Sequence, residues 1–355
     1  PRARTRVPNV RDDQIEDFRD ALRDCERRGA AYLYHLAEGT DDSSRAHFLN
    51  LQANGLLESP LVGIHSLALR DGDLEELAAA GCGVCWSPLS NLLLYGATID
   101  PARLSSAGVE FTIGCDWSAS GSKNLLQELK VAAFLNAQSG EPFSSHDLVA
   151  AVTTNAALRL GWQAHLGSIR SGALADFVVI RGRQDDPYQH LIAATEDDIC
   201  LVGIHGRARY GDFDLVKSIH PGPDTDLEVI TVGGRTKGLY LAHPESPINQ
   251  VTYSSARETL TRAMSDLHGF VQEQEEDAIE FATLGVPGQR FSLVLDNELE
   301  ELLNDPLTAT DASDVDVEFA AESVDDMATS LPLDDLTVVD ADDDYWERVD
   351  GQRNL

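Results

Sequence analysis

Between residues 12 and 136, segments with apolar side chains at helical spacing alternate with short, continuous apolar runs. In the first helical segment Ile15, Phe18, Leu22 and Cys25 fall on one face, and Gly29 is expected to end the helix. Uninterrupted apolar runs are typical of strands buried on both faces of a parallel sheet. The pattern therefore predicts repeated βα units. The four predicted strands cover residues 30–36, 61–65, 84–87 and 109–115.

Each predicted strand is followed by a predicted helix, which gives the chain an α/β fold. Four such units are half of a (β/α)8 barrel, although four units also fit a small open sheet. The basic segment before residue 12 shows no strand pattern, and residues 144–164 read as one continuous helix.

Beyond Gly167 the pattern changes to short β-like runs at residues 175–181, 199–204 and 228–232, which indicate a small β-domain. Residues 291–350 contain twenty Asp or Glu residues and only one basic residue, Arg348. Such a stretch cannot bury enough apolar surface to offset its ordering entropy, so we expect a solvated tail. The predicted domains are 1–165 (half-barrel), 166–245 (β-sandwich-like portion), 246–290 (helical extension) and 291–355 (acidic tail).

The net charge of −33 argues against nucleic acid and membranes as partners, because a polyanion repels phosphate backbones and anionic lipid surfaces. Only four of the 27 cationic residues are Lys. An acidic surface with little Lys suits high salt, although an acidic tail alone would also skew the average. Five cysteines scattered through apolar segments point to a reducing, cytoplasmic location. Because the first residue is Pro1 and not Met, we expect a chain cut from something longer.

Polar side chains follow all four predicted strands where each strand ends. They are His35 and Glu38 after the first, His65 at the end of the second, Asn91 after the third and Asp116 after the fourth. In a parallel barrel the carboxyl ends of the strands carry the catalytic groups. A single His at a strand end is more often structural, and a single Asp there is more often a helix cap. Their joint occurrence predicts one functional rim.

Metal-assisted hydrolysis is the chemistry that such a rim suggests. A divalent ion held by imidazole and carboxylate lowers the pKa of water towards about 7. A carboxylate beside the ion can then carry protons from the water to the leaving group, and Glu38 suits that role. Trp117, at the same rim, could stack on a flat ring.

These motifs resemble the amidohydrolase superfamily, in the branch of cytosine, guanine and S-adenosylhomocysteine deaminases and triazine chlorohydrolases. The resemblance covers about residues 12–240 and predicts strands 5–8 of a (β/α)8 TIM barrel followed by part of a β-sandwich. It rests on His35-Leu36-Ala37-Glu38, His65, Ser87-Pro88-Leu89-Ser90-Asn91, Gly114-Cys115-Asp116, Gly167-Ser168-Ile169 and Ala175-Asp176-Phe177-Val178-Val179.

The resemblance assigns a role to each rim residue. It implies that His35 is a metal ligand, that Glu38 transfers protons and that His65 orients the water or substrate. It further implies that Asp116 is both a ligand and a general base, and that Asn91 belongs to the substrate pocket. The expected cofactor is a divalent ion, zinc or iron, and the expected substrate is a small molecule.

The sequence also departs from the family, because it contains no His-x-His pair, which in the family binds the metal from the first barrel strand. One His and one Asp are too few for a tight metal site. The chain alone is therefore expected to be an incomplete enzyme, a fragment that lacks the N-terminal His-x-His. An exposed sheet edge would make it a homo-oligomer or dependent on the missing half.

Two functional hypotheses follow. The first is a hydrolase, deaminase-like or chlorohydrolase-like, of a C–N or C–halogen bond on a small heterocycle. The second is a degenerate, non-catalytic chain that kept the fold for binding or assembly. Glu38 favours the enzyme, because its expected role is proton transfer. A third class, an open-sheet nucleotide-binding protein, is disfavoured because the sequence has no Gly-rich turn leading into a helix.

Overall fold

The computed structural model describes residues 4–6, 10–11, 14–243 and 251–273, and these form two compact units. The first unit contains the described residues up to Arg207 together with Val232–Gly234, and the second contains Ala208–Thr231 and the described residues from Arg235 onwards. The predicted acidic tail, residues 291–355, lies outside the described residues, as does part of the predicted helical extension. Within the described residues, no helix is both long and apolar enough to cross a membrane.

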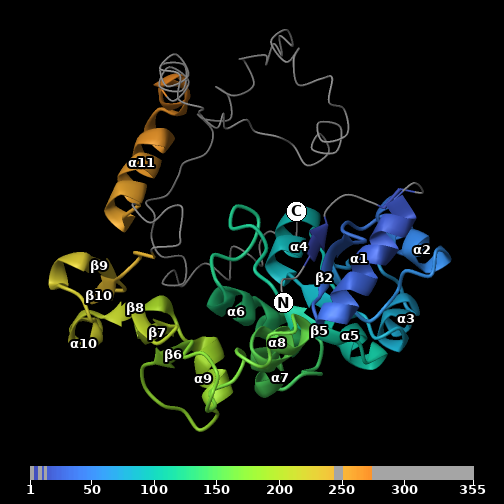
Figure 1. Cartoon of the computed structure of the whole chain (residues 1–355), viewed down its shortest axis with the longest axis horizontal. Coiled ribbons are helices and arrows are strands. Elements are labelled where there is room, and N and C mark those ends of the chain that lie inside the picture. The colour runs from blue at the N-terminus through green and yellow to red at the C-terminus, as the bar shows by residue number, and fades with distance from the viewer. Residues whose placement is uncertain (1–3, 7–9, 12–13, 244–250, 274–355) are drawn as a thin grey trace. The chain divides into compact units, whose positions relative to one another are not determined.

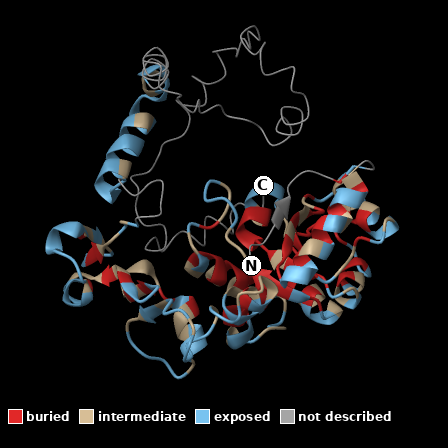
Figure 2. Ribbon diagram, in the orientation of Figure 1, coloured by how far each residue is buried: buried red, intermediate tan, exposed pale blue. Residues whose placement is uncertain are grey.

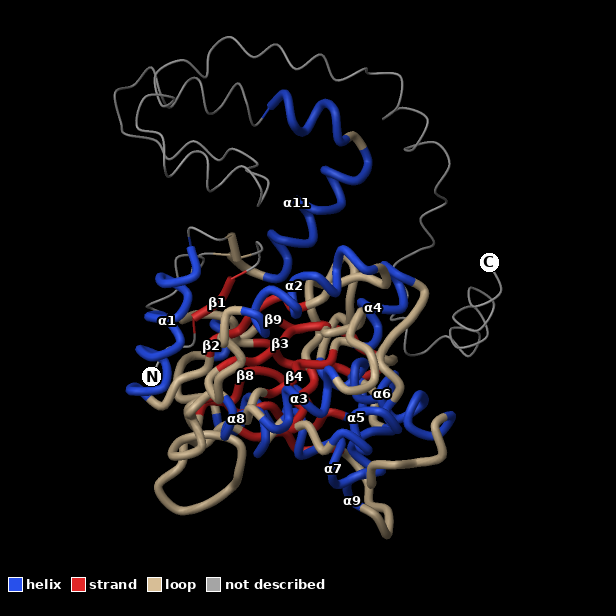
Figure 3. Tube along the Cα trace, turned by 90° about the vertical axis from the view of Figure 1, so that its right-hand side faces the viewer, coloured by secondary structure: helices blue, strands red, loops and turns tan. Residues whose placement is uncertain are grey.

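A parallel sheet forms the centre of the first unit (Figures 1 and 3). Its strands follow one another in chain order, and every neighbouring pair is parallel. Consecutive parallel strands linked by helices are the arrangement expected of a TIM-barrel-like fold. The strands are β1 (Arg4–Arg6), β2 (Tyr32–Leu36), β3 (Leu61–His65), β4 (Gly83–Trp86) and β5 (Glu110–Ile113).

Helices cover the sheet and bury its apolar side chains (Figure 2). The helix predicted at the start of the chain buries Ile15, Phe18, Leu22 and Cys25, and Gly29 ends it with φ of 59°. The helices of this unit are α1 (Ile15–Arg28), α2 (Asp42–Ala53), α3 (Asp73–Ala79), α4 (Pro88–Tyr95), α5 (Pro101–Ala107), α6 (Leu125–Gln138), α7 (Ser145–Val152), α8 (Thr154–Arg159) and α9 (Pro187–Ala193).

The structure corrects two expectations for the sheet and its helices. The basic segment holds a strand after all, because β1 pairs in parallel with β2, so the sheet has five strands instead of four. Residues 144–164 do not form one helix, since Thr153, with φ of −127° and ψ of −92°, separates α7 from α8. Both features depend on tertiary pairing and local backbone geometry that apolar spacing does not report.

The β-like runs after Gly167 are strands, and two more strands join them. In the first unit β6 (Phe177–Ile180) pairs antiparallel with β7 (Ile199–Ile204). In the second unit β8 (Arg207–Asp212) pairs antiparallel with β10 (Arg235–Leu239), and β9 (Glu228–Val232) lies next to β10. This unit also contains α10 (Phe213–Ile219) and α11 (Tyr253–Ser265). The pattern missed β8 and β10.

Arg159, the last residue of α8, ties together the amino ends of three strands. One guanidinium nitrogen donates to the carbonyl oxygens of Ser59, at 3.2 Å, and Gly81, at 2.9 Å, just before β3 and β4. The other nitrogen pairs with Glu110, the first residue of β5. The side chain is only 14% exposed. These contacts join the amino ends of the strands, on the side of the sheet away from the strands' carboxyl ends.

Glu128, on α6, is a carboxylate buried inside the first unit. It accepts hydrogen bonds from the backbone N–H of Leu89, at 3.0 Å, and from the hydroxyl of Ser122, and it has no cationic partner among the described residues. Burial raises the pKa of Glu128 to about 7, and the negative charge of Asp116 adds to the shift, while both hydrogen bonds oppose it. Glu128 therefore binds a proton more tightly in the folded than in the unfolded protein.

We expect Glu128→Gln to change how stability depends on pH. Unfolded Glu128 loses its proton near its ordinary pKa, whereas folded Glu128 keeps it up to about pH 7, so rising pH favours unfolding in between. From about pH 5.5 to about pH 8 the wild type should lose about 2 kcal/mol more unfolding free energy than the variant. Denaturant unfolding of both proteins at the two pH values measures this difference. An equal loss of unfolding free energy in both proteins would mean that folded Glu128 titrates near its ordinary pKa.

Candidate active site

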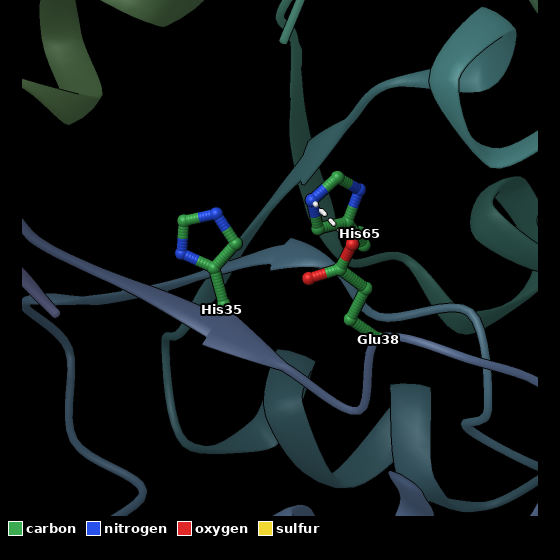
Figure 4. Close-up of side chains that lie close together, drawn as sticks. All are labelled: His35, Glu38 and His65. Atoms are coloured by element: carbon green, nitrogen blue, oxygen red, sulfur yellow. Dashed lines mark ion pairs between the residues drawn. The ribbon is translucent and has the colours of Figure 1, made fainter. Parts of the chain in front are cut away.

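Four of the predicted site residues lie together at the carboxyl ends of the strands. His35 is the fourth residue of β2, Glu38 follows that strand by two residues, and His65 ends β3. Asp116 comes three residues after the end of β5. In Figure 4 the carboxylate of Glu38 points towards the imidazole of His65, with His35 beside them.

His65 is the centre of this cluster, and its side chain is only 1% exposed. Its Nε2 atom lies 3.5 Å from Oε1 of Glu38 and 3.8 Å from Oδ2 of Asp116. One imidazole nitrogen therefore faces two carboxylates that come from different strands of the sheet.

The other ring nitrogen is held by Asn91. Nδ1 of His65 lies 2.9 Å from Oδ1 of Asn91, whose amide nitrogen donates to the hydroxyl of Thr98 at 3.2 Å. Because the Asn91 oxygen can only accept, Nδ1 of His65 carries the proton of this bond. In the neutral imidazole, Nε2 then keeps its lone pair and directs it at the two carboxylates. Three acceptors so arranged repel one another unless positive charge lies between them.

The donor set of the rim fits a divalent cation. His35, Glu38 and His65 each offer one donor atom, and these three atoms lie within 4.8 Å of one another. The centroids of the two imidazole rings are 5.4 Å apart. Imidazole nitrogen and carboxylate oxygen are ligands that zinc and iron share. Asp116 lies next to this group, because its carboxylate is close to Nε2 of His65.

Each rim carboxylate is held by a hydroxyl group from α4. The Tyr95 hydroxyl donates to Oε1 of Glu38 at 2.9 Å, and the Ser90 hydroxyl donates to Oδ2 of Asp116 at 2.5 Å. Burial, together with the hydrogen bond to Glu38, raises the pKa of Tyr95 to about 12. The phenol therefore stays protonated at neutral pH and remains a donor to Glu38.

The backbone at the rim adopts conformations that side chains usually avoid. Ala37, His65, Ser66 and Asp116 all have positive φ, between 50° and 65°. Left-handed backbone is uncommon for residues other than glycine and costs about 1–3 kcal/mol where it is strained. These four make up most of the positive-φ residues other than glycine in the described part of the chain. Their concentration at strand ends is typical of a functional site.

The two residues predicted to contact substrate are placed differently from the rest. Asn91 is fully buried and uses its side chain on His65 and Thr98, so it orients the imidazole. Trp117 follows Asp116 in the chain, but its side chain is 72% exposed. Sequence reasoning assigned no role to Ser90, Tyr95 or Glu128. Ser90 and Tyr95 lie in the stretch that follows the third predicted strand, which was the available signal.

The amidohydrolase family matches residues 7–208, which is more than half of the chain. The chain is 31% identical over 199 residues to the 5-methylthioadenosine/S-adenosylhomocysteine deaminase of Pelotomaculum thermopropionicum, covering 51% of this chain and 46% of that protein. It is 30% identical over 199 residues to the 5'-deoxyadenosine deaminase of Methanothermobacter thermautotrophicus, with the same two coverages. The chain spans about half the length of these curated relatives.

A solved structure supports the fold. The adenosine deaminase from Xanthomonas campestris, a structure with bound zinc, superposes with a TM-score of 0.51 over 58% of this chain and 51% of that one, at 24% identity. This likeness bears on the fold alone, and it agrees with the parallel α/β architecture. The family resemblance inferred from the strand-end motifs is thus confirmed, and the chain belongs to the amidohydrolase family.

Proposed function

We propose that this chain provides part of the active site of a metal-dependent hydrolytic deaminase that cleaves the exocyclic C–N bond of an adenosine-type nucleoside. The observation that carries the proposal is the convergence of Nε2 of His65 with the carboxylates of Glu38 and Asp116, beside His35. The deaminase relatives support the substrate class. Cleavage of a C–halogen bond on a heterocycle is the second candidate, since the attacking water would be the same.

In this proposal His35 and Asp116 would hold a divalent ion, zinc or iron, and His65 would lie close to it. When bound, such an ion lowers the pKa of water and polarises the group under attack. Two protein ligands are few for a tight site, and the paired histidines of the family are not in the sequence. We therefore propose that further ligands come from outside these 355 residues, from the rest of the protein or from a partner.

The residues of the chain move the protons. Glu38 takes a proton from the attacking water and passes it to the leaving nitrogen, which departs as ammonia. Asp116 accepts the second proton of the water and delivers it to the neighbouring ring nitrogen, so that the oxygen stays on the ring carbon as a carbonyl group and both carboxylates end unprotonated. Tyr95 holds Glu38 in place, and the Nδ1 proton of His65, fixed by Asn91, keeps Nε2 directed at the reacting group.

Location and surroundings follow from the same features. The five cysteines are all buried or partly buried, which suits thiols in a reducing compartment, and we place the enzyme in the cytoplasm. Trp117, exposed beside Asp116, is available to stack on a heterocycle.

Ammonia release tests the proposal directly. The full-length protein produced from its own gene, loaded with zinc or iron, should release ammonia from adenosine-type nucleosides and should lose this activity when a chelator removes the metal. A metal-loaded protein that releases neither ammonia from nucleosides nor halide from halogenated heterocycles would instead support the non-catalytic, binding role.

Three variants should separate metal binding from proton transfer. Glu38→Gln removes the proton-accepting carboxylate but keeps its size, so turnover should fall by roughly 10²–10⁴-fold while metal content stays near wild type. His35→Ala removes a ligand, so metal and turnover should fall together. Asp116→Asn should lower both in part. Metal per chain is measured beside kcat; loss of metal in Glu38→Gln with retention in His35→Ala would reverse the two roles.

Tyr95→Phe should impair the orientation of Glu38 without changing metal content. Losing one hydrogen bond to a charged group that is partly exposed predicts a fall in turnover of about tenfold. The control is the same change in a Glu38→Gln background, where it should have almost no further effect because the carboxylate is already gone. An equal additional loss in that background would show that Tyr95 acts independently of Glu38.

A further inference from the structure

We propose that Glu128 is a positioning residue of the active site: its buried carboxylate fixes the start of α4 against the loop between β5 and α6, and thereby sets the geometry of His65 and Asp116. Glu128 itself lies behind the rim and contacts no reacting group. The inference concerns the same rim as the proposed function, but its structural part stands even if that rim binds no metal.

The first step is the start of α4, which lacks an ordinary cap. The N-cap residue Ser87 makes no side-chain capping bond, and Pro88 at the first helical position has no N–H. The first free N–H belongs to Leu89, and it donates to Oε1 of Glu128 at 3.0 Å. An acceptor supplied from α6 thus caps α4, and its negative charge suits the positive end of the helix.

The second step is the loop between β5 and α6. The buried hydroxyl of Ser122 donates to Oε2 of Glu128, and the backbone N–H of Ser122 donates to the carbonyl of Cys115 at 3.1 Å. The loop is so closely packed that a Cβ atom on Gly121 would lie 2.1 Å from that carbonyl. Asp116 is the residue that follows Cys115. Glu128 therefore accepts one hydrogen bond from α4 and one from this loop, and so joins the two.

The third step is how the position of α4 affects the rim. The two residues after Leu89 are Ser90, whose hydroxyl bonds to Asp116, and Asn91, whose amide bonds to Nδ1 of His65. Both side chains are fully buried, as Glu128 is. Because Asp116 lies on the loop and His65 ends β3, a shift of α4 away from both would stretch the two bonds at once. Glu128 acts on the rim through these two residues.

The energetic cost of Glu128 supports a positioning role over simple packing. A buried carboxylate without a cationic partner is unfavourable, and the raised pKa of Glu128 reflects that cost. An apolar side chain of similar volume would avoid it, but it could not hold Leu89 and Ser122. The network is fully satisfied, and such networks fix one geometry more strictly than apolar packing does.

The test uses two readouts, neither of which requires activity. The first is the ¹⁵N signals of the His65 ring in the metal-free chain at high pH, assigned by their loss in His65→Gln. The second is the zinc dissociation constant of the full-length protein, from competition with a chelator. In the wild type the His65 ring should be protonated on Nδ1. Glu128→Leu should mix the two tautomers and weaken zinc binding by about 10–100-fold.

Glu128→Gln is the conservative rescue, because its amide can accept from Leu89 and donate to Ser122; both readouts should stay near wild type. Asn136→Leu is the matched control. Asn136 is also buried on α6, and its side chain, within the described part of the chain, bonds to the backbone of Phe143 and not to the rim, so its loss should lower the melting temperature but leave both readouts unchanged. If Glu128→Leu does not fold, Ser122→Ala removes one of the two bonds and should change both readouts in the same direction by a smaller amount.

Unchanged His65 signals in folded Glu128→Leu or Ser122→Ala would overturn the proposal and leave Glu128 a stabilising residue only. Failure of the full-length wild-type protein to bind zinc would instead count against the proposed function. The His65 signals would still decide the role of Glu128 in that case.

Discussion

In-register parallel pairing is the constraint on which the active-site rim depends. β2 and β3 pair with Leu36 opposite His65, and β4 and β5 pair with Trp86 opposite Ile113. Tyr34 and Leu36 are fully buried, and His35 between them faces the other side of the sheet. Because side chains alternate along a strand, a slip of one residue would exchange these faces and dismantle the cluster. The apolar core that stabilises the sheet thus also places the histidines.

Much of this arrangement could be predicted from the sequence because the rim residues follow apolar runs directly. Each run is long enough to identify a buried strand, and the carboxyl ends of parallel strands lie on one side of the sheet, so His35, Glu38, His65 and Asp116 could be grouped from the sequence alone. The sequence failed where local pattern carries no signal. Arg4–Arg6 is a polar tripeptide whose strand depends on pairing with β2, and the break at Thr153 lies inside an otherwise helical pattern.

The hydrogen bonds that orient the rim were beyond the reach of the sequence for a different reason. Asn91 and His65 are 26 residues apart, Tyr95 and Glu38 are 57 apart, and Glu128 and Leu89 are 39 apart. Each pair joins a polar residue that is ordinary on its own helix to a partner from another βα unit. Their significance comes from burial and direction, which only the folded chain reveals. Asn91 shows the limit well: its position was predicted, whereas its use on His65 was not.

Arg159 has a consequence for how natural variation in this protein would look. Its guanidinium joins the amino ends of β3, β4 and β5, at the edge opposite the rim. A variant at that edge should reduce how much folded protein a cell accumulates while leaving each surviving molecule as capable as before. A variant at the carboxyl edge should do the reverse. Two lineages could therefore lose the same cellular activity through opposite ends of one sheet, and protein abundance would distinguish them.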